Sequence, residues 1–417
     1  MEYKVTITLD GSRSDALQKA LAVTRISTIL HSVVEVDIGE GRMCQDFRWV
    51  HKIPYLFSPT LFTLVKAIPT MRQLHTLRLS RIFLAQAHLC CILSSPYLTH
   101  LVLDAVQMPN ISKLRLSPPK LRKLTTVAMY SWEAIAPLLI ELAASLEYYE
   151  LHECHLRAPG QLQLPPFPSL RKLRYDQNYF GLFDDTAVLN ALLRASQVTH
   201  LQLSGWVDYR CIATSQKSLQ HLSIDVDMLT EQILGTDPFP RLMSLSIQCH
   251  RSWKLNQHFT ISSFIRDYFP EITLLHLSIP WSLRRPALVI ARSQDNVQAL
   301  ELSVVTKSGL DWEESRLWSY EEEVPTDYFR NSTFPAVLQS LKVDVAQTSY
   351  ELERSVPPCT RWISDNILPP VTGLGGSDLK YIDVSFVQPK SVLERERVIS
   401  KRWVKSPDDD WQIEECL

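Results

Sequence analysis

One short apolar pattern recurs along the chain and constrains its fold more than any other feature. The stretches LTHLVLD (Leu98–Asp104), VTHLQLS (Val198–Ser204) and LQHLSID (Leu219–Asp225) each read apolar, two spacers, apolar, one spacer, apolar. Self-similarity at a regular period indicates a repeat architecture. The central apolar residue of the pattern stands at Leu77, Leu101, Leu124, Tyr149, Leu173, Leu201, Leu222, Leu245, Leu275, Leu300, Leu341 and Ile382, and an earlier copy is Val33-x-x-Val36-x-Ile38.

The period and the alternation within each copy predict how the repeats pack. Most spacings between neighbouring copies lie in the range of roughly 20–29 residues that is typical of leucine-rich repeats, as from Leu77 to Leu101. Because alternate side chains of a strand face opposite ways, Leu201 should point into a core and His200 and Gln202 away from it. A single repeat cannot bury its own apolar side, whereas stacked parallel strands can.

The segments between the strand motifs have helical periodicity. Apolar residues recur at three- and four-residue steps in Ala85–Leu93, Trp132–Leu146 and Asp184–Ser196. Asp184 or Asp185 is a candidate N-cap for the last of these helices. Strand, helix and strand at this period predict a parallel sheet with right-handed crossovers.

Phe-Pro pairs precede four of the strand motifs, at Phe167, Phe239, Phe269 and Phe334. Proline ends a preceding helix and favours extended backbone before it. We expect each phenylalanine to fill the core at the corner beneath the next strand.

The predicted fold is therefore an α/β leucine-rich-repeat solenoid, a horseshoe-like arc with a parallel sheet on its concave face and helices on its convex face. The chain divides into three parts on this interpretation. Residues 1–57 form an N-terminal capping strand, a helix and a first irregular repeat; residues 58–388 form the repeat array, with insertions near 307–334 and 346–377; and residues 389–417 form a C-terminal capping helix (Ser391–Trp403) followed by an acidic tail.

Composition and motif searches point away from chemistry. The net charge of −2 does not favour nucleic acid as a partner, and no apolar run is long enough to span a membrane. The eight cysteines include no Cys-x-x-Cys pair and the N-terminus has no apolar leader, so we expect reduced thiols in a cytoplasmic or nuclear protein. In HECH (His152–His155), His152 and Cys154 would share a strand face, but no second pair of ligands accompanies them. We expect no enzymatic activity, cofactor or metal.

The spacer residues of successive strands should line up as one binding surface on the concave face. Two interpretations of its recurring histidines remain open: exposed residues that suit a strand, or members of a partner-binding surface. In the second, an acidic or phosphorylated segment of a target protein is the expected partner of a monomeric chain. The candidate partner-binding residues are Arg78, His100, Lys123, Tyr148, Glu150, Lys172, Arg174, His200, Gln202, His221 and His276.

Taken together, the stretch Ser58–Ser80, the serial motifs that end with LKYIDVS (Leu379–Ser385) and the Phe-Pro pairs resemble the repeat region of fungal, basidiomycete-like F-box proteins. The resemblance covers roughly Val33–Val387 and implies that the repeats hold the target of a ubiquitin ligase of the SCF type. In such proteins a separate F-box binds the adaptor Skp1, but residues 1–57 contain no recognisable F-box, so a Skp1-like adaptor would need an F-box outside this chain. The alternatives are a freestanding repeat scaffold or inhibitor, and an enzyme whose site would be a pocket of convergent titratable groups.

Overall fold

The computed structural model describes the repeat strands and most of the helices between them, and divides the chain into two compact units, Met1–Ser218 and Leu219–Leu417. The described residues are 3–8, 32–39, 59–108, 120–129, 131–154, 156, 162–177, 186–205, 209–225, 237–248, 257–280, 290, 294–306, 337–347, 381–388, 397–405 and 411–416. The helix predicted within residues 1–57, both candidate N-caps and the insertion predicted near 307–334 lie outside these residues. So does the insertion predicted near 346–377, except for Ala346 and Gln347, which belong to a strand.

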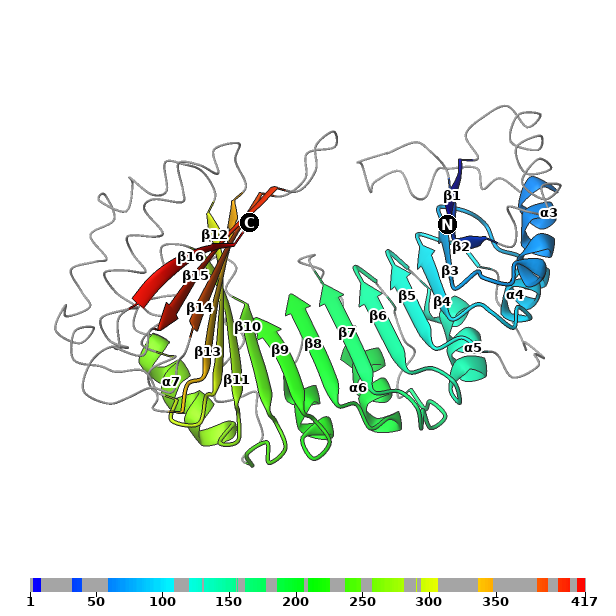
Figure 1. Ribbon diagram of the computed structural model, residues 1–417. Coiled ribbons are helices and arrows are strands. Elements are labelled where there is room, and N and C mark those ends of the chain that lie inside the picture. Colours follow the sequence, from blue (N-terminus) through cyan, green and yellow to red (C-terminus); the bar gives the residue numbers. More distant parts are fainter. Residues whose placement is uncertain are drawn as a thin grey trace. The chain divides into compact units, whose positions relative to one another are not determined.

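The first unit contains a sheet in which every strand runs parallel to the next strand of the sequence (Figure 1). The register places each central apolar residue beside the next one, as for Leu77 and Leu101. The strands are β1 (Tyr3–Thr8), β2 (Val33–Gly39), β3 (Thr76–Ser80), β4 (His100–Asp104), β5 (Lys123–Val127), β6 (Tyr148–His152), β7 (Lys172–Gln177) and β8 (His200–Gly205).

Helices connect several of these strands, and α4, α5 and α6 lie on one side of the sheet (Figure 1). The N-terminus of α5 is capped by Ser131, whose Oγ accepts a hydrogen bond of 3.2 Å from the backbone N–H of Ala134. The helical elements of the unit are α3 (Pro59–Ala67), η2 (Ile68–Thr70), α4 (Gln86–Leu93), α5 (Trp132–Leu142), α6 (Thr186–Ala195) and η3 (Tyr209–Ser215). The three helices predicted from periodicity are therefore confirmed within a few residues of their expected bounds.

The predicted core residues are buried. The central positions of β3–β8 form one continuous row in which no side chain is more than 2% exposed: Leu77, Leu101, Leu124, Tyr149, Leu173 and Leu201. Each such aliphatic side chain contributes roughly 1.5–3 kcal/mol to folding before chain ordering is counted.

The backbone repeats as regularly as the side chains. At the start of the strands, one carbonyl accepts two N–H groups from the next repeat: the oxygen of His75 bonds Thr99 and His100, at 3.0 and 2.9 Å. At the end of the strands, a residue in the left-handed region donates its N–H to the last residue of the next strand, as Ala105 does to Val127 at 2.8 Å. Among the described residues of the first unit, the left-handed ones are Arg81, Ala105, Ala128, Glu153 and Gly205, with φ between 49° and 84°.

The second unit continues with parallel strands and ends with two antiparallel ones. Its strands are β9 (His221–Asp225), β10 (Ser244–Gln248), β11 (Leu274–Pro280), β12 (Ala299–Thr306), β13 (Ser340–Gln347), β14 (Tyr381–Gln388), β15 (Arg397–Lys405) and β16 (Trp411–Cys416), with helix α7 (Gln257–Tyr268) between β10 and β11. Both units are thus α/β, with sheets that are mostly parallel and few helices. No helix in the described part of the chain is both long and apolar enough to cross a membrane.

The predicted C-terminal capping helix is wrong, and so is the expectation that the acidic tail from Pro407 onward has no regular structure. Residues from Arg397 form the strand β15, and the acidic segment from Trp411 forms β16. The edge of β14 presents backbone groups that need partners, and β15 supplies them. The pairing also buries Trp403, which is 1% exposed beside Ile382, and lets Arg402 bind both oxygens of Asp383, at 2.6 and 3.2 Å.

The Phe-Pro pairs place phenylalanine in the core, as predicted. Phe167, Phe239 and Phe269 are at most 1% exposed. The rings of Phe239 and Phe269 pack with centroids 5.3 Å apart, so successive repeats of the second unit contact each other through these corners. Phe334 lies outside the described residues.

Candidate binding face

The spacer residues of β3–β8 lie on the side of the sheet opposite the buried leucines, and we call this side the polar face. The register places His100, Lys123, Tyr148, Lys172 and His200 in one row across β4–β8. A second row, from β3 to β8, is Arg78, Val102, Thr125, Glu150, Arg174 and Gln202. Every candidate of the first unit therefore lies on this face; His221 and His276 lie on β9 and β11 of the second unit.

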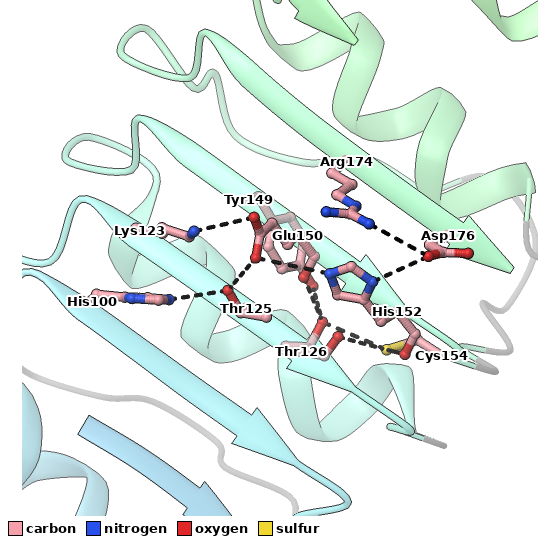
Figure 2. Close-up of polar contacts among 10 residues, drawn as sticks. All are labelled: His100, Lys123, Thr125, Thr126, Tyr149, Glu150, His152, Cys154, Arg174 and Asp176. Atoms are coloured by element: carbon pink, nitrogen blue, oxygen red, sulfur yellow. Dashed lines mark hydrogen bonds and ion pairs between the residues drawn. The ribbon is translucent and has the colours of Figure 1, made fainter. Parts of the chain in front are cut away.

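Glu150 is the centre of a polar network on this face (Figure 2). Its Oε1 lies 3.1 Å from Nζ of Lys123, and its Oε2 accepts a 2.7 Å hydrogen bond from the hydroxyl of Thr125. Burial alone would raise the pKa of Glu150, but His152, Tyr148, Thr125 and Lys123 favour the carboxylate more strongly and hold that pKa well below its ordinary value. Glu150 is thus a fixed anion whose charge is compensated within the sheet.

His152 lies between two carboxylates. Its Nδ1 is 3.5 Å from Oδ2 of Asp176 and its Nε2 is 3.8 Å from Oε2 of Glu150. Asp176 and then Glu150 raise the pKa of His152 to about 9, against the effect of its partial burial. His152 in turn lowers the pKa of Asp176, whose Oδ2 also lies 3.7 Å from the guanidinium of Arg174. At neutral pH, His152 is therefore an imidazolium ion.

His100 is neutral, in contrast to His152. Burial, followed by the charge of Lys123, lowers the pKa of His100 to about 4. Its Nε2 lies 3.1 Å from the hydroxyl oxygen of Thr125, and that hydroxyl donates its own proton to Glu150. The oxygen of Thr125 therefore accepts from His100, which assigns the ring proton to Nε2. One chain of hydrogen bonds runs from β4 to β6.

Tyr148 positions the ammonium group of Lys123. Nζ of Lys123 lies over the ring of Tyr148, 4.4 Å from its centroid. Burial and the neighbouring carboxylate of Glu150 raise the pKa of Tyr148 to about 12, so its phenol stays protonated. Tyr148 and Lys123 thus form a rigid cationic and aromatic pair at the start of β5 and β6.

Two departures from the apolar pattern, Thr126 and Tyr149, compensate each other on the buried side. The hydroxyl of Thr126 lies 3.3 Å from the hydroxyl of Tyr149 and 3.3 Å from the backbone oxygen of Glu150 (Figure 2). The thiol of Cys154 donates to the backbone oxygen of Thr126, at 3.4 Å. These groups are buried and satisfied, so they belong to the core.

Asp176 was not predicted from the sequence, Thr125 was recognised as a spacer residue but not included among the candidates, and His152 was considered only as part of a metal motif. The expectation that His152 and Cys154 share a face is wrong: Glu153 has φ 51° and ends the alternation, so Cys154 turns into the core. The missed signal is a third spacer row one step further along each strand. No cluster of metal-binding side chains occurs among the residues that the structure describes.

On the corresponding face of the second unit, His276 lies between two hydroxyl groups. Nδ1 of His276 lies 3.0 Å from the hydroxyl of Ser246, and its Nε2 lies 2.8 Å from that of Ser303. Burial lowers the pKa of His276. His276 is therefore a neutral bridge between two serines, on β10 and β12.

A pocket in the first unit lies between β1, β2 and the helical segment of α3 and η2. All its lining residues are apolar: Val5, Val33, Val36, Ile38, Leu64, Ile68 and Met71. No titratable side chain lines it, so it does not have the convergent polar groups of an active site.

No protein-family model matches the chain, and no curated protein matches it.

Proposed function

We propose that this chain is a leucine-rich-repeat protein that binds a target protein through its polar face without a covalent step. The repeated backbone supports the repeat assignment, because both the apolar row and the paired N–H contacts to one carbonyl recur from strand to strand. The single observation that carries the binding proposal is the polar face itself. Nine candidate residues chosen from the spacer pattern lie together on it.

The network of the polar face favours recognition over catalysis. Lys123, Thr125, Glu150 and His152 hold one another in place, so a partner would meet side chains that are already ordered. Preordered side chains lose little entropy on binding, which favours affinity and specificity. A nucleophile beside His152 would be needed for acyl transfer, and its two ring nitrogens face carboxylates instead.

Cross-linking from defined positions tests this proposal. A photo-reactive amino acid at Lys172 or at Gln202 of the polar face should capture the same protein in an extract of the source cells. The matched control is Arg194, which is exposed on α6. Equal capture of that protein from the Arg194 position would show that the polar face is not the binding surface.

A triple variant supplies the complementary measurement. Replacing Lys172, Arg174 and His200 by alanine should weaken binding of the captured partner at least about tenfold, since charged and aromatic contacts dominate interfaces. The melting temperature should change little, because none of these side chains lies in the apolar core.

The narrower proposal is that the target is a substrate of an F-box-type ubiquitin ligase. Its support is the resemblance of the repeat motifs and Phe-Pro pairs to F-box proteins. The alternative is a freestanding repeat scaffold or inhibitor. A pull-down with Skp1, using the product of the full native transcript, distinguishes these two functions. Absence of Skp1 binding would exclude the ligase proposal and favour the scaffold or inhibitor.

A further inference from the structure

Positive charge gathers at the strand starts of the first unit. The residues that lead into β3–β8 are 72–76, 97–100, 120–123, 145–148, 169–172 and 197–200. They contain one acidic residue, Glu147, and the six basic residues Arg72, Lys120, Arg122, Lys123, Arg171 and Lys172, which we call the basic rim. The ends of the same strands carry the acidic residues Asp104, Glu153 and Asp176 instead.

Most of the charge on the basic rim is not compensated by any residue in the described part of the chain. Arg122 pairs with Glu147 at 3.4 Å, and Lys123 pairs with Glu150 at 3.1 Å. The side chains of the other four are exposed, and none of them makes a hydrogen bond or ion pair with a residue that the structure describes. These four are Arg72, Lys120, Arg171 and Lys172.

Backbone contacts fix the centre of the rim. The carbonyl of Arg122 accepts N–H groups from Glu147 and Tyr148, and the carbonyl of Glu147 accepts those of Arg171 and Lys172, all at 2.8–3.1 Å. Lys123, Tyr148 and Lys172 therefore stand in one row on consecutive strands. With about 4.8 Å between neighbouring strands, the two lysines start about 9.6 Å apart, with the ring of Tyr148 between them.

We propose that the basic rim binds an extended acidic peptide segment of the target protein, with carboxylates at every third residue. This deepens the proposed function and rests on it. A polyproline II segment advances about 3.1 Å per residue with three residues per turn, so residues i and i+3 lie on one side about 9.3 Å apart. That repeat matches the separation of the strand positions of Lys123 and Lys172. Nζ of Lys123 is shared with Glu150 and the ring of Tyr148, whereas Lys172 makes no ion pair with a described residue, so Lys172 would supply the stronger contact to a carboxylate.

The distribution of charge favours a peptide over a nucleic acid. A strand of five residues is about 17 Å long, so the acidic strand ends lie within reach of any broad polyanion centred on the rim. Asp104 is paired with Arg78 and Asp176 with His152, which leaves the negative charge of Glu153 to oppose such a ligand. A single extended chain is narrow enough to lie over the rim alone, and the net charge of −2 provides no general attraction for nucleic acid.

Direct binding to synthetic peptides tests the inference. The probe is a labelled peptide of four Glu-Pro-Pro units, which holds carboxylates at every third residue, and fluorescence anisotropy measures its affinity for the whole chain. We expect saturable binding that weakens as salt rises. A Gln-Pro-Pro peptide of equal length should bind at least about tenfold more weakly, since it lacks the charge.

Two variants locate the site. The double variant R171E and K172E should weaken binding of the Glu-Pro-Pro peptide at least about tenfold. R194E, an equally exposed change on α6, should leave binding unchanged. Melting temperatures close to that of the wild type would show that both variants are folded. We expect this result, because none of the three side chains has a partner in the described residues.

Three results would overturn the inference: no binding of the acidic peptide, equal loss in both variants, or tighter binding of a twelve-nucleotide single-stranded DNA than of the peptide. The proposed function can survive that failure. Cross-linking from Lys172 and Gln202 could still capture a target protein whose binding is not weakened in the double variant R171E and K172E. In that case the polar face binds its target through contacts other than the basic rim.

Discussion

The polar faces of the two units use the same backbone for different chemistry. In the first unit His152 lies between Glu150 and Asp176 and carries a charge, whereas in the second His276 lies between Ser246 and Ser303 and is neutral. The buried sides do not differ in this way, because both consist mainly of aliphatic residues, with Thr126, Tyr149 and Tyr175 as departures in the first unit. The repeat thus constrains one side of each strand, and the other side is free to acquire a specific surface.

The difference also concerns how strongly each face is held. The first unit joins neighbouring strands through ion pairs and hydrogen bonds that are partly shielded from water, such as the one between Thr125 and Glu150. The second contains the pair Lys342 and Asp344, 2.7 Å apart but 49% and 29% exposed and on one strand. Its pair between neighbouring strands, Arg402 and Asp383, is also 43% and 33% exposed. Exposed pairs of this kind contribute little, so the charged face of the first unit is the better candidate for a rigid recognition surface.

A charge on the buried side should be equally damaging in both units. Leu201 is 2% exposed and Leu245 is fully buried. Leu201→Asp and Leu245→Asp each place an unpaired carboxylate in the apolar row, and we expect each to lower the free energy of unfolding by at least about 4 kcal/mol. Circular dichroism during urea unfolding measures this effect. If one variant were as stable as the wild type, the apolar rows of the two units would not be equivalent.

Removing the central group should affect the two polar faces unequally. Glu150→Ala leaves Lys123 and His152 without their shared partner and should cost about 2–3 kcal/mol. Ser303→Ala removes one hydrogen bond from His276 and should cost about 1 kcal/mol. Urea unfolding of the two variants gives the comparison. Equal losses would mean that the network around Glu150 is no stronger than a single neutral hydrogen bond.

The parallel strands and their buried side could be predicted because their signal is repeated. The alternation around Leu101 and Leu201 determines the strand, its buried side and its neighbours at once, and many copies outweigh local departures such as Thr126. The C-terminal strands could not be predicted in the same way. Around Val398 and Trp403 the apolar residues fit both helical and strand periods, and only the open edge of β14 decides between them.

The sequence predicts which residues lie on the polar face, but it does not predict which of them contact one another. Sequence alternation gives the side on which Lys123 and Glu150 lie. It does not give the distances between side chains on different strands, because these depend on register and rotamer. His152 and Asp176 were missed for a simpler reason: they stand one spacer beyond the motif, where the sequence pattern no longer requires a strand.

The charged histidine of the first unit should make stability fall as pH rises. The pKa of His152 is raised from 6.5 to about 9 on folding, so the folded state binds the extra proton between these values. Its stabilising effect is complete below about pH 6.5 and is lost as pH rises through about 9. We expect the wild type to lose on the order of 1–2 kcal/mol over this range relative to His152→Gln.

His276 serves as a control, because its effect on the pH dependence of stability should have the opposite sign. Its pKa is lowered on folding, so its protonation favours the unfolded state and wild-type stability relative to His276→Gln should rise as pH increases through about 6.5. Urea unfolding of the wild type and both variants between about pH 5.5 and 9.5 measures the two slopes. Slopes of the same sign would contradict the assignment of a charged His152 and a neutral His276.

The smallest expected effect concerns the ends of β4 and β8. A left-handed residue lies at the end of both strands. It is Gly205, with φ 84°, as the last residue of β8, and Ala105, with φ 49°, directly after β4. Left-handed backbone costs a residue with a Cβ about 1–2 kcal/mol, whereas glycine adds about 0.4–1 kcal/mol of entropy to the unfolded state. Ala105→Gly should therefore stabilise the first unit by about 0.5 kcal/mol, and Gly205→Ala should destabilise it by a similar amount. Thermal melting of the two variants checks the pair. Loss of stability in Ala105→Gly would show that the methyl group of Ala105 contributes more packing than its backbone conformation costs.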